Sequence, residues 1–364
     1  MTSILIFLAG AVLLVYSAEK LIGYLVGVAR GLRVSLFLLA VVFTGIEFDD
    51  VIFGVALNME DLDGVAVGVV FGTALSMIGL VLALAAILTP CKVSIPRNYL
   101  FCFALTPLVM LGFSLAAPLS VVHGVLLIAA YAVFLAYVVV QESRADRPVF
   151  RDAELHEAFV LQEAGAAGAG GTMVAERTGG NAVADTARRD GAGSNGDLSE
   201  KLPFASVIGG WPGLGLALLA LVGLIAGASL LGIGTEGILE QFDLEETVFG
   251  ATIATAVLTI EDIFLTVEPI RKGAPEVGVA NIVGSVIFAA TGKLGVIALA
   301  GSLVVGTDVL KWHLPALAVF TWLAAAFIST GRLQRWHGVV LMALYVVYWI
   351  GSLQVFGTVP VEMD

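Results

Sequence analysis

The sequence predicts an all-α integral membrane protein with ten transmembrane helices, arranged as two inverted repeats of five helices each. Of its 364 residues, 59% are hydrophobic and only 13% are charged, whereas soluble domains carry about 25% charged residues. The mean hydropathy is +0.99. Apolar segments long enough to cross a bilayer recur along the whole chain, and two of them contain acidic clusters at corresponding places. These observations together define the predicted fold class.

The apolar segments fall into two groups of five. A spanning helix needs about 20 apolar residues at a rise of about 1.5 Å per residue. The first group predicts spans at 4–28, 34–57, 64–89, 99–117 and 119–140, and the second group at 211–239, 247–270, 277–305, 310–330 and 338–356. We therefore expect residues 1–140 to form the first repeat and residues 204–364 the second. The first segment lacks a basic leader, so we expect a spanning helix there and not a cleaved signal.

The polar stretch 141–203 separates the two groups. It is rich in Gly, Ala and charged residues, and it cannot bury enough apolar surface to offset the loss of chain entropy on folding. We expect a largely disordered, cytoplasmic loop.

The basic residues of the short connections predict the orientation. If the ten spans alternate, eight basic residues lie on one side and one on the other, and the basic side is cytoplasmic. The eight are Arg30, Arg33, Lys92, Arg97, Arg271, Lys272, Arg332 and Arg335, and the one is Lys311. Both termini are then outside, in a multi-pass protein of the cytoplasmic membrane. Five helices per half also give the two halves opposite orientations, as in many secondary transporters.

Composition also bounds the function. The net charge of −12 argues against binding of nucleic acid or anionic lipid by charge, and an acidic chain with more Arg than Lys fits a halophilic archaeon. We find no nucleotide-binding loop and no nucleophile motif, so we expect a transporter driven by an ion gradient and not an enzyme. No cofactor and no protein partner is expected, and Cys91 and Cys102 are predicted to pack among apolar residues.

The two acidic clusters predict a cation site inside the membrane. The stretch 41–54 reads VVFTGIEFDDVIFG and contains Glu47, Asp49 and Asp50, while 249–265 reads FGATIATAVLTIEDIFL and contains Glu261 and Asp262. An ionised Asp at the bilayer centre costs about 2.5–3.5 kcal/mol on the mildest scale. A group of this cost faces a partner, a water-filled path or a bound cation. Alternatively, the acids pair with Lys293 or with backbone groups and carry no ion.

The same stretches resemble the sodium/calcium exchanger family of the cation/calcium antiporter superfamily. The family's first signature, G-T-S-x-P-E, falls on residues 45–50 and 257–262, and its second, G-N-x-x-G-S-N/D-x-F, falls on 68–74 and 280–288. The resemblance covers about residues 10–88 and 220–300, and it includes the ten-helix layout with a central cytoplasmic loop. In that family the glutamate of each first signature binds calcium, and sodium competes for neighbouring oxygens.

Transferred position by position, the resemblance implies that Asp50 and Asp262 are the central ion ligands. The signature serine corresponds to Glu47 and Thr259, and the proline to Asp49 and Glu261. Three further residues either contribute oxygens to the site or satisfy hydrogen bonds between helices: Thr73, Asn281 and Ser285. The Asn or Asp of the second signature falls on Ala74 and Val286, which have no side-chain oxygen. The family pattern therefore predicts the fold and leaves the ion and its stoichiometry open.

Helical spacing groups these candidates. Residues three apart share a helix face, so Glu47 with Asp50, and Thr259 with Asp262, each present a pair of oxygens. Gly45 permits a helix break in the first motif, whereas the second motif has no Gly or Pro. Lys293 lies within a predicted span, and two interpretations stay open. Its ammonium either sits near the site in place of a sodium ion, or it snorkels to an interface or pairs with one acid.

We therefore expect a secondary antiporter that exports calcium, or a similar divalent cation, in exchange for sodium by alternating access. The transported partners are calcium and sodium ions, and the protein itself lies in the lipid bilayer. Because a fully ionised empty site is unfavourable, the protein would change between its two access states only when cations or protons are bound to the site. One alternative keeps the fold and couples to protons. Another is a membrane protein that senses ions and does not transport them.

Overall fold

The computed structural model describes residues 2–31, 47–116, 118–144, 210–271, 273 and 275–356. Most of the predicted loop 141–203 lies outside these residues, as do Gly45 and the first half of the predicted span 34–57. Almost everything described is helical, apart from one short two-stranded sheet.

The first half follows the predicted order. Its elements are α1 (Thr2–Gly31), α3 (Phe48–Met59), α4 (Asp63–Ser76), the π-helical segment η1 (Met77–Leu82), α5 (Ala83–Leu88), β1 (Cys91–Lys92), α6 (Arg97–Leu115) and α7 (Val121–Arg144). The elements α4, η1 and α5 run on without a gap and make one span of 26 residues.

In the described residues the second half contains four π-helical segments where the first contains one, and its strand precedes the last helical span, whereas the first-half strand follows α5. Its elements are α9 (Gly210–Phe242), α10 (Glu246–Phe249), the π-helical η2 (Gly250–Ala254), α11 (Thr255–Leu258), α12 (Ile260–Arg271), α13 (Pro275–Phe288), the π-helical η3 (Ala289–Lys293), α14 (Leu294–Ala300), the π-helical η4 (Val309–His313), α15 (Leu314–Ser329), β2 (Arg332–Leu333), α16 (Arg335–Gly351) and the π-helical η5 (Ser352–Phe356). β2 pairs antiparallel with β1, with Cys91 opposite Leu333.

The apolar helices confirm an all-α membrane fold. Within the described residues, seven helices are long and apolar enough to cross a membrane, or eight if the pair 246–258 and 260–271, bent by 50°, forms one span. The other two predicted spans correspond to α1, whose apolar part is Thr2–Ala18, and to the segment that ends in α3. The described residues therefore do not establish the full count of ten.

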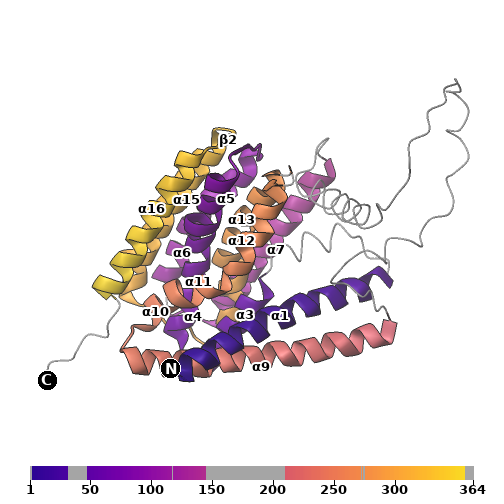
Figure 1. Ribbon diagram of the computed structural model, residues 1–364, viewed down its shortest axis with the longest axis vertical. Coiled ribbons are helices and arrows are strands. Elements are labelled where there is room, and N and C mark those ends of the chain that lie inside the picture. The colour runs from indigo at the N-terminus through magenta and orange to yellow at the C-terminus, as the bar shows by residue number, and fades with distance from the viewer. Residues whose placement is uncertain are drawn as a thin grey trace, which may run out of the picture.

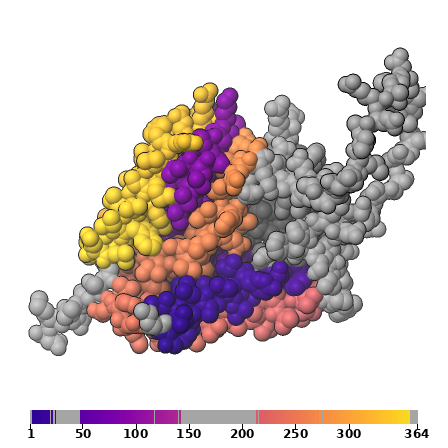
Figure 2. Space-filling model, viewed as in Figure 1, coloured from indigo at the N-terminus to yellow at the C-terminus, as the bar shows by residue number. Residues whose placement is uncertain are grey.

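The helices form a bundle crossed at one end by a helix pair. α1 and α9 pack against each other along their length and lie across the ends of the remaining helices (Figure 1). In the space-filling view this pair forms a continuous surface along one edge of the molecule (Figure 2). The spans 63–88 and 278–300 are the most deeply buried of the described spans. The centre of the bundle is therefore built from α4 with η1 and from α13 with η3.

Helices α3 and α4 have the same boundaries as α12 and α13 at a constant offset of 212 residues. α4 and α13 each contain 14 residues, and each continues into a π-helical segment, η1 or η3. The turns before them match as well, because Asp61 and Gly273 occupy equivalent positions and have φ of 60° and 89°. This left-handed backbone suits glycine and is tolerated by aspartate. The offset that aligns the acidic clusters in the sequence therefore also aligns these helices and turns.

Small residues let α4 approach η2 at backbone distance. A Cβ atom built on Gly68 would lie 2.3 Å from the carbonyl oxygen of Thr247, and one built on Gly250 would lie 2.4 Å from that of Val65. Gly68 and Gly72 form a small-xxx-small pattern, which permits close crossing of helices in membranes. This crossing fixes the place of α4, which supplies one wall of the candidate site.

Candidate functional site

Both acidic clusters lie where a helix begins. Glu47 is the residue before α3, and Asp49 and Asp50 are in the first turn of that helix. Glu261 and Asp262 occupy the first turn of α12, directly after the 50° bend at Thr259. The first backbone N–H groups of a helix lack partners within the helix, and its dipole favours negative charge at this end. Two helix starts therefore present carboxylates toward the centre of the bundle.

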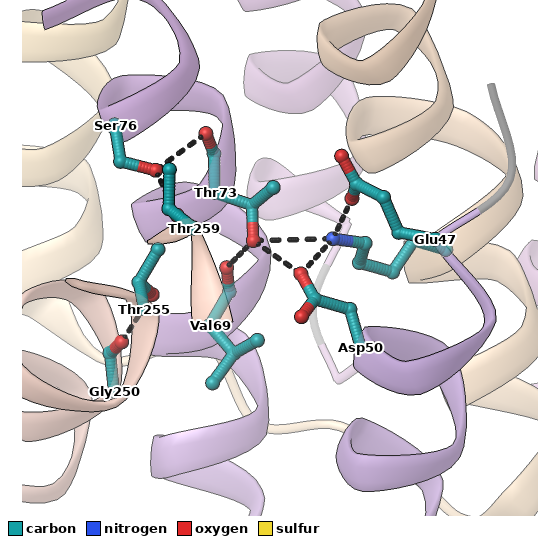
Figure 3. A network of polar contacts seen from close by, with 9 residues as sticks. Glu47, Asp50, Val69, Thr73, Ser76, Gly250, Thr255 and Thr259 are labelled. Carbon is teal, nitrogen blue, oxygen red and sulfur yellow. Dashed lines mark hydrogen bonds and ion pairs between the residues drawn. The ribbon is translucent and has the colours of Figure 1, made fainter. Parts of the chain in front are cut away.

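The break in the second half follows a π-helical segment, and no Gly or Pro lies in the motif itself. The π-helical η2 precedes α11, and the hydroxyl of Thr255 donates a hydrogen bond to the carbonyl oxygen of Gly250 at 2.6 Å (Figure 3). Sharp bends in helices commonly accompany such π-helical insertions. The second motif therefore breaks although it contains neither Gly nor Pro.

Lys293 is the centre of the polar network. It ends η3, its side chain is 0% exposed, and its ammonium donates to Oε2 of Glu47 and to Oδ2 of Asp50. The Nζ atom also lies 3.1 Å from Oγ1 of Thr73. The Thr73 hydroxyl is in turn 2.7 Å from Oδ2 of Asp50 and 2.9 Å from the carbonyl oxygen of Val69, two alternative acceptors for its one proton (Figure 3).

This placement excludes one of the interpretations of Lys293. Snorkelling to an interface is wrong, because the whole side chain is buried. The ammonium lies among the candidate ligands, as one interpretation has it, and pairs with two acids, Glu47 and Asp50, where the other interpretation has a pair with one acid. A buried ammonium needs such partners, since an isolated buried charge is strongly destabilising. Glu47 and Asp50 therefore share a structural partner within the protein.

The remaining acids lie beside this ion pair. Asp49, Glu261 and Asp262 are half-buried. Asp49 and Asp262 each interact electrostatically with Glu47, Asp50 and Lys293. In the described ranges, no group of three His, Cys, Asp or Glu side chains has the arrangement of a metal site. The sequence prediction of a shared site therefore holds for proximity of the acids, and their role as ion ligands stays a prediction.

The other candidate ligands divide into two sets. Thr259 is buried, and its hydroxyl shares a hydrogen bond of 2.8 Å with that of Ser76, which also donates to the carbonyl oxygen of Thr73 (Figure 3). Ser285 is buried near the Glu47 carboxylate. By contrast, the Asn281 amide donates to the Thr266 hydroxyl at 3.3 Å, which is a contact between helices α13 and α12. Of the two roles predicted for Asn281, the structure shows the helix-to-helix bond.

Ser76 was missed by the sequence prediction. It lies in α4 one turn after Thr73 and is 0% exposed, and it joins the first half to Thr259 of the second half. The equivalent position in the second half is Phe288, so the repeat alignment gives no signal for a polar residue here. A buried serine in an apolar helix was the only available hint.

The chain matches known proteins along most of its length. The family model described as sodium/calcium exchanger protein matches residues 2–140 and 212–354. An uncharacterized membrane protein of Methanocaldococcus jannaschii is 22% identical over 349 residues, covering 94% of this chain and 95% of that protein. The sodium/calcium exchanger MaX1 of Methanosarcina acetivorans is 30% identical over 112 residues, which cover only 30% of this chain and 32% of that protein.

Solved structures show the same fold. Structures of the sodium-calcium exchanger NCX_Mj superpose with a TM-score of 0.53 at 20% identity, covering 97% of this chain and 99% of that one, for crystals soaked with 2.5 mM Na⁺ and 0.1 mM Ca²⁺. For crystals soaked with 10 mM Na⁺ and no Ca²⁺ the TM-score is 0.52 at the same identity and coverage. The family match and the multiple apolar helices support a multi-pass membrane transporter that exchanges cations, including calcium. The chain belongs to the sodium/calcium exchanger protein family.

Proposed function

We propose that this protein is a secondary antiporter that exports calcium, or a similar divalent cation, in exchange for sodium by alternating access. In this proposal the ten helices form two inverted repeats in the cytoplasmic membrane, with both termini outside. The observation that carries it is the pair of equivalent aspartates, Asp50 and Asp262, each in the first turn of a helix that begins inside an apolar region. Such a pair is expected where two inverted repeats meet at a midplane ion site.

The acids near Asp262 provide the chemistry for a divalent ion. Calcium takes six to eight oxygen ligands, which carboxylates, carbonyls and water supply. Glu47 and Asp50 are already paired with Lys293, so in this proposal the negative charge for a transported ion comes first from Asp49 and Asp262. Helix α11 ends at Leu258 and α12 begins at Ile260, so the helix is interrupted next to these acids. In this proposal Glu47 and Asp50 hold Lys293, and the neighbouring acids bind the transported ion.

Alternating access would use the same charge. With no cation present, the acids repel one another, and this repulsion opposes closure of the site. A divalent ion, or competing sodium ions, relieves the repulsion and allows the two halves to rock. Exchange results because movement of the empty, fully ionised site is unfavourable.

The decisive test is uptake of radiolabelled calcium into proteoliposomes loaded with sodium, comparing wild type with Asp262→Asn. The matched control is Asp61→Asn, because Asp61 is an exposed turn residue with φ of 60°, a conformation that asparagine also tolerates. We expect sodium-driven uptake in wild type and in the control, and its loss in Asp262→Asn.

Other outcomes point to other functions. If uptake does not depend on sodium but depends on an imposed pH gradient, the coupling ion is the proton. The number of carboxylates in the site favours this alternative. No uptake under either gradient would contradict calcium exchange and favour ion sensing without transport.

A further inference from the structure

We propose that the Lys293 ammonium acts as a tethered monovalent cation that permanently occupies the oxygens of Glu47, Asp50 and Thr73, which we call the first-half cation position. Each transport cycle would then carry one sodium ion fewer than a protein with a free cation position in both halves. This inference rests on the proposed exchange function and specifies its stoichiometry. Three independent features of the structure support it.

The first feature is the ligand set around the ammonium. The three N–H groups of a lysine ammonium have three oxygen partners here, from Glu47, Asp50 and Thr73. Two carboxylates and a hydroxyl form the kind of oxygen set that hard metal cations also take. Asp50 and Thr73 moreover belong to the two stretches that match the exchanger signatures. The ammonium therefore lies on the oxygens that would otherwise be free for a cation.

The second feature is the difference between the two halves. The position equivalent to Lys293 is Val81, which is buried and apolar. The position equivalent to Glu47 is Thr259, which is uncharged. The first-half position thus has one additional carboxylate, and an ammonium from the other half faces it. The additional charges cancel, and the second-half position around Asp262 has no equivalent lysine.

The third feature is that the ion pair crosses the halves of the chain. Lys293 belongs to η3, whereas its partners come from the start of α3 and from α4. A transported ion must leave these oxygens in every cycle, but a lysine side chain cannot leave the protein. The oxygens of Glu47 and Asp50 therefore remain neutralised while the ion bound near Asp262 is exchanged.

The test counts sodium ions bound to purified protein in detergent, by equilibrium binding of radioactive sodium. The key variant is Glu47→Thr with Lys293→Val, which gives the first half the residues found at the equivalent positions and keeps the net charge. Lys293→Met is a second variant that removes only the ammonium. Lys293→Arg keeps the charge within the site, and Lys311→Met, at an exposed lysine of η4, controls for loss of a lysine elsewhere.

We expect the number of bound sodium ions to rise by about one per chain in the double variant and in Lys293→Met, since one monovalent cation replaces the ammonium. Lys293→Arg and Lys311→Met should keep the wild-type number. In proteoliposomes the charge moved per calcium should change by the same amount. A folded double variant with the wild-type number of sodium ions would overturn the proposal, as would an additional sodium ion in Lys293→Arg.

The binding measurement separates this inference from the exchange function. If wild type transports no calcium but the double variant still gains a sodium site, the proposed function fails and the tethered cation stands. If wild type exchanges calcium for sodium and the sodium number is the same in all variants, the exchange function stands and Lys293 is only a structural partner of Glu47 and Asp50.

Discussion

Replacing Gly72 with alanine would insert a methyl group into the contact between α4 and the helix 246–258. The new Cβ atom would lie 2.3 Å from Oγ1 of Thr255, 2.7 Å from Cα of Ala251 and 2.8 Å from the carbonyl oxygen of Ala251. Carbon atoms in contact prefer separations of about 3.5–4.0 Å, so the two helices must part by roughly 1 Å. The Thr255 hydroxyl cannot simply rotate away, because it donates to the carbonyl oxygen of Gly250.

The cost follows from these contacts. Overpacking against an immobile neighbour typically costs about 1–3 kcal/mol, and loss of the Thr255 hydrogen bond would add about 1 kcal/mol. The better helix propensity of alanine returns up to about 1 kcal/mol. We therefore expect Gly72→Ala to lower the free energy of unfolding by about 2 kcal/mol. The matched control is Gly284→Ala at the equivalent position of α13, where a Cβ atom would meet no heavy atom within 4 Å.

The assay is unfolding by SDS in mixed micelles, with the free energy of unfolding measured for wild type and both variants. Gly284→Ala should be as stable as wild type or up to about 1 kcal/mol more stable. If Gly72→Ala is as stable as Gly284→Ala, then α4 and η2 do not cross at backbone distance and the placement of Thr73 and Ser76 derived from that crossing is refuted.

Three further predictions use the same unfolding assay. In sodium-free buffer, Lys293→Met should cost about 3–5 kcal/mol because it leaves buried carboxylates unpaired, and combining it with Glu47→Gln should recover about 1–3 kcal/mol; strictly additive effects would contradict the ion pair. Ser76→Ala should cost about 1–3 kcal/mol by leaving the Thr259 hydroxyl without its partner, and an unchanged stability would argue against that bond. Burial and a neighbouring carboxylate raise the pKa of Glu60 above its ordinary value of 4.5, so ionisation of this side chain destabilises the fold; wild type should gain stability relative to Glu60→Gln as the pH falls from 7 toward 4.5, and a constant difference would refute this.

The membrane spans could be predicted closely because hydropathy and length determine them. The predicted span 64–89 became 63–88, and the predicted span 338–356 became 335–356. Likewise, the offset between the acidic clusters in the sequence was enough to align the two halves. These features depend on local composition and on the thickness of the bilayer, so no knowledge of tertiary contacts is required.

The contacts of the site could not be predicted in the same way. Pairing of the acids with Lys293 was one of the alternatives that the sequence offered. However, Lys293 and Glu47 are 246 residues apart, and nothing in the sequence shows which of the five acids are its partners. The π-helical segments η1, η2 and η3 were also not anticipated, because such insertions depend on how a helix packs against its neighbours. The position of Lys293 at the end of η3 is therefore a tertiary property, although its burial in an apolar span marked it as unusual.

The differences between the halves are coupled with one another. Ser76 is hydrogen-bonded to Thr259. At the offset of 212 residues, the position equivalent to Ser76 is Phe288 and the position equivalent to Thr259 is Glu47. A phenyl ring cannot neutralise a buried carboxylate, so Glu47 needs a cation from elsewhere in α13 and η3, and Lys293 supplies it. Thr259 is neutral and needs only the Ser76 hydroxyl, which is why Val81 can replace lysine in the first half. The departures from two-fold symmetry thus form one compensated set around the two unchanged aspartates, and removing any single member should be more harmful than exchanging the set.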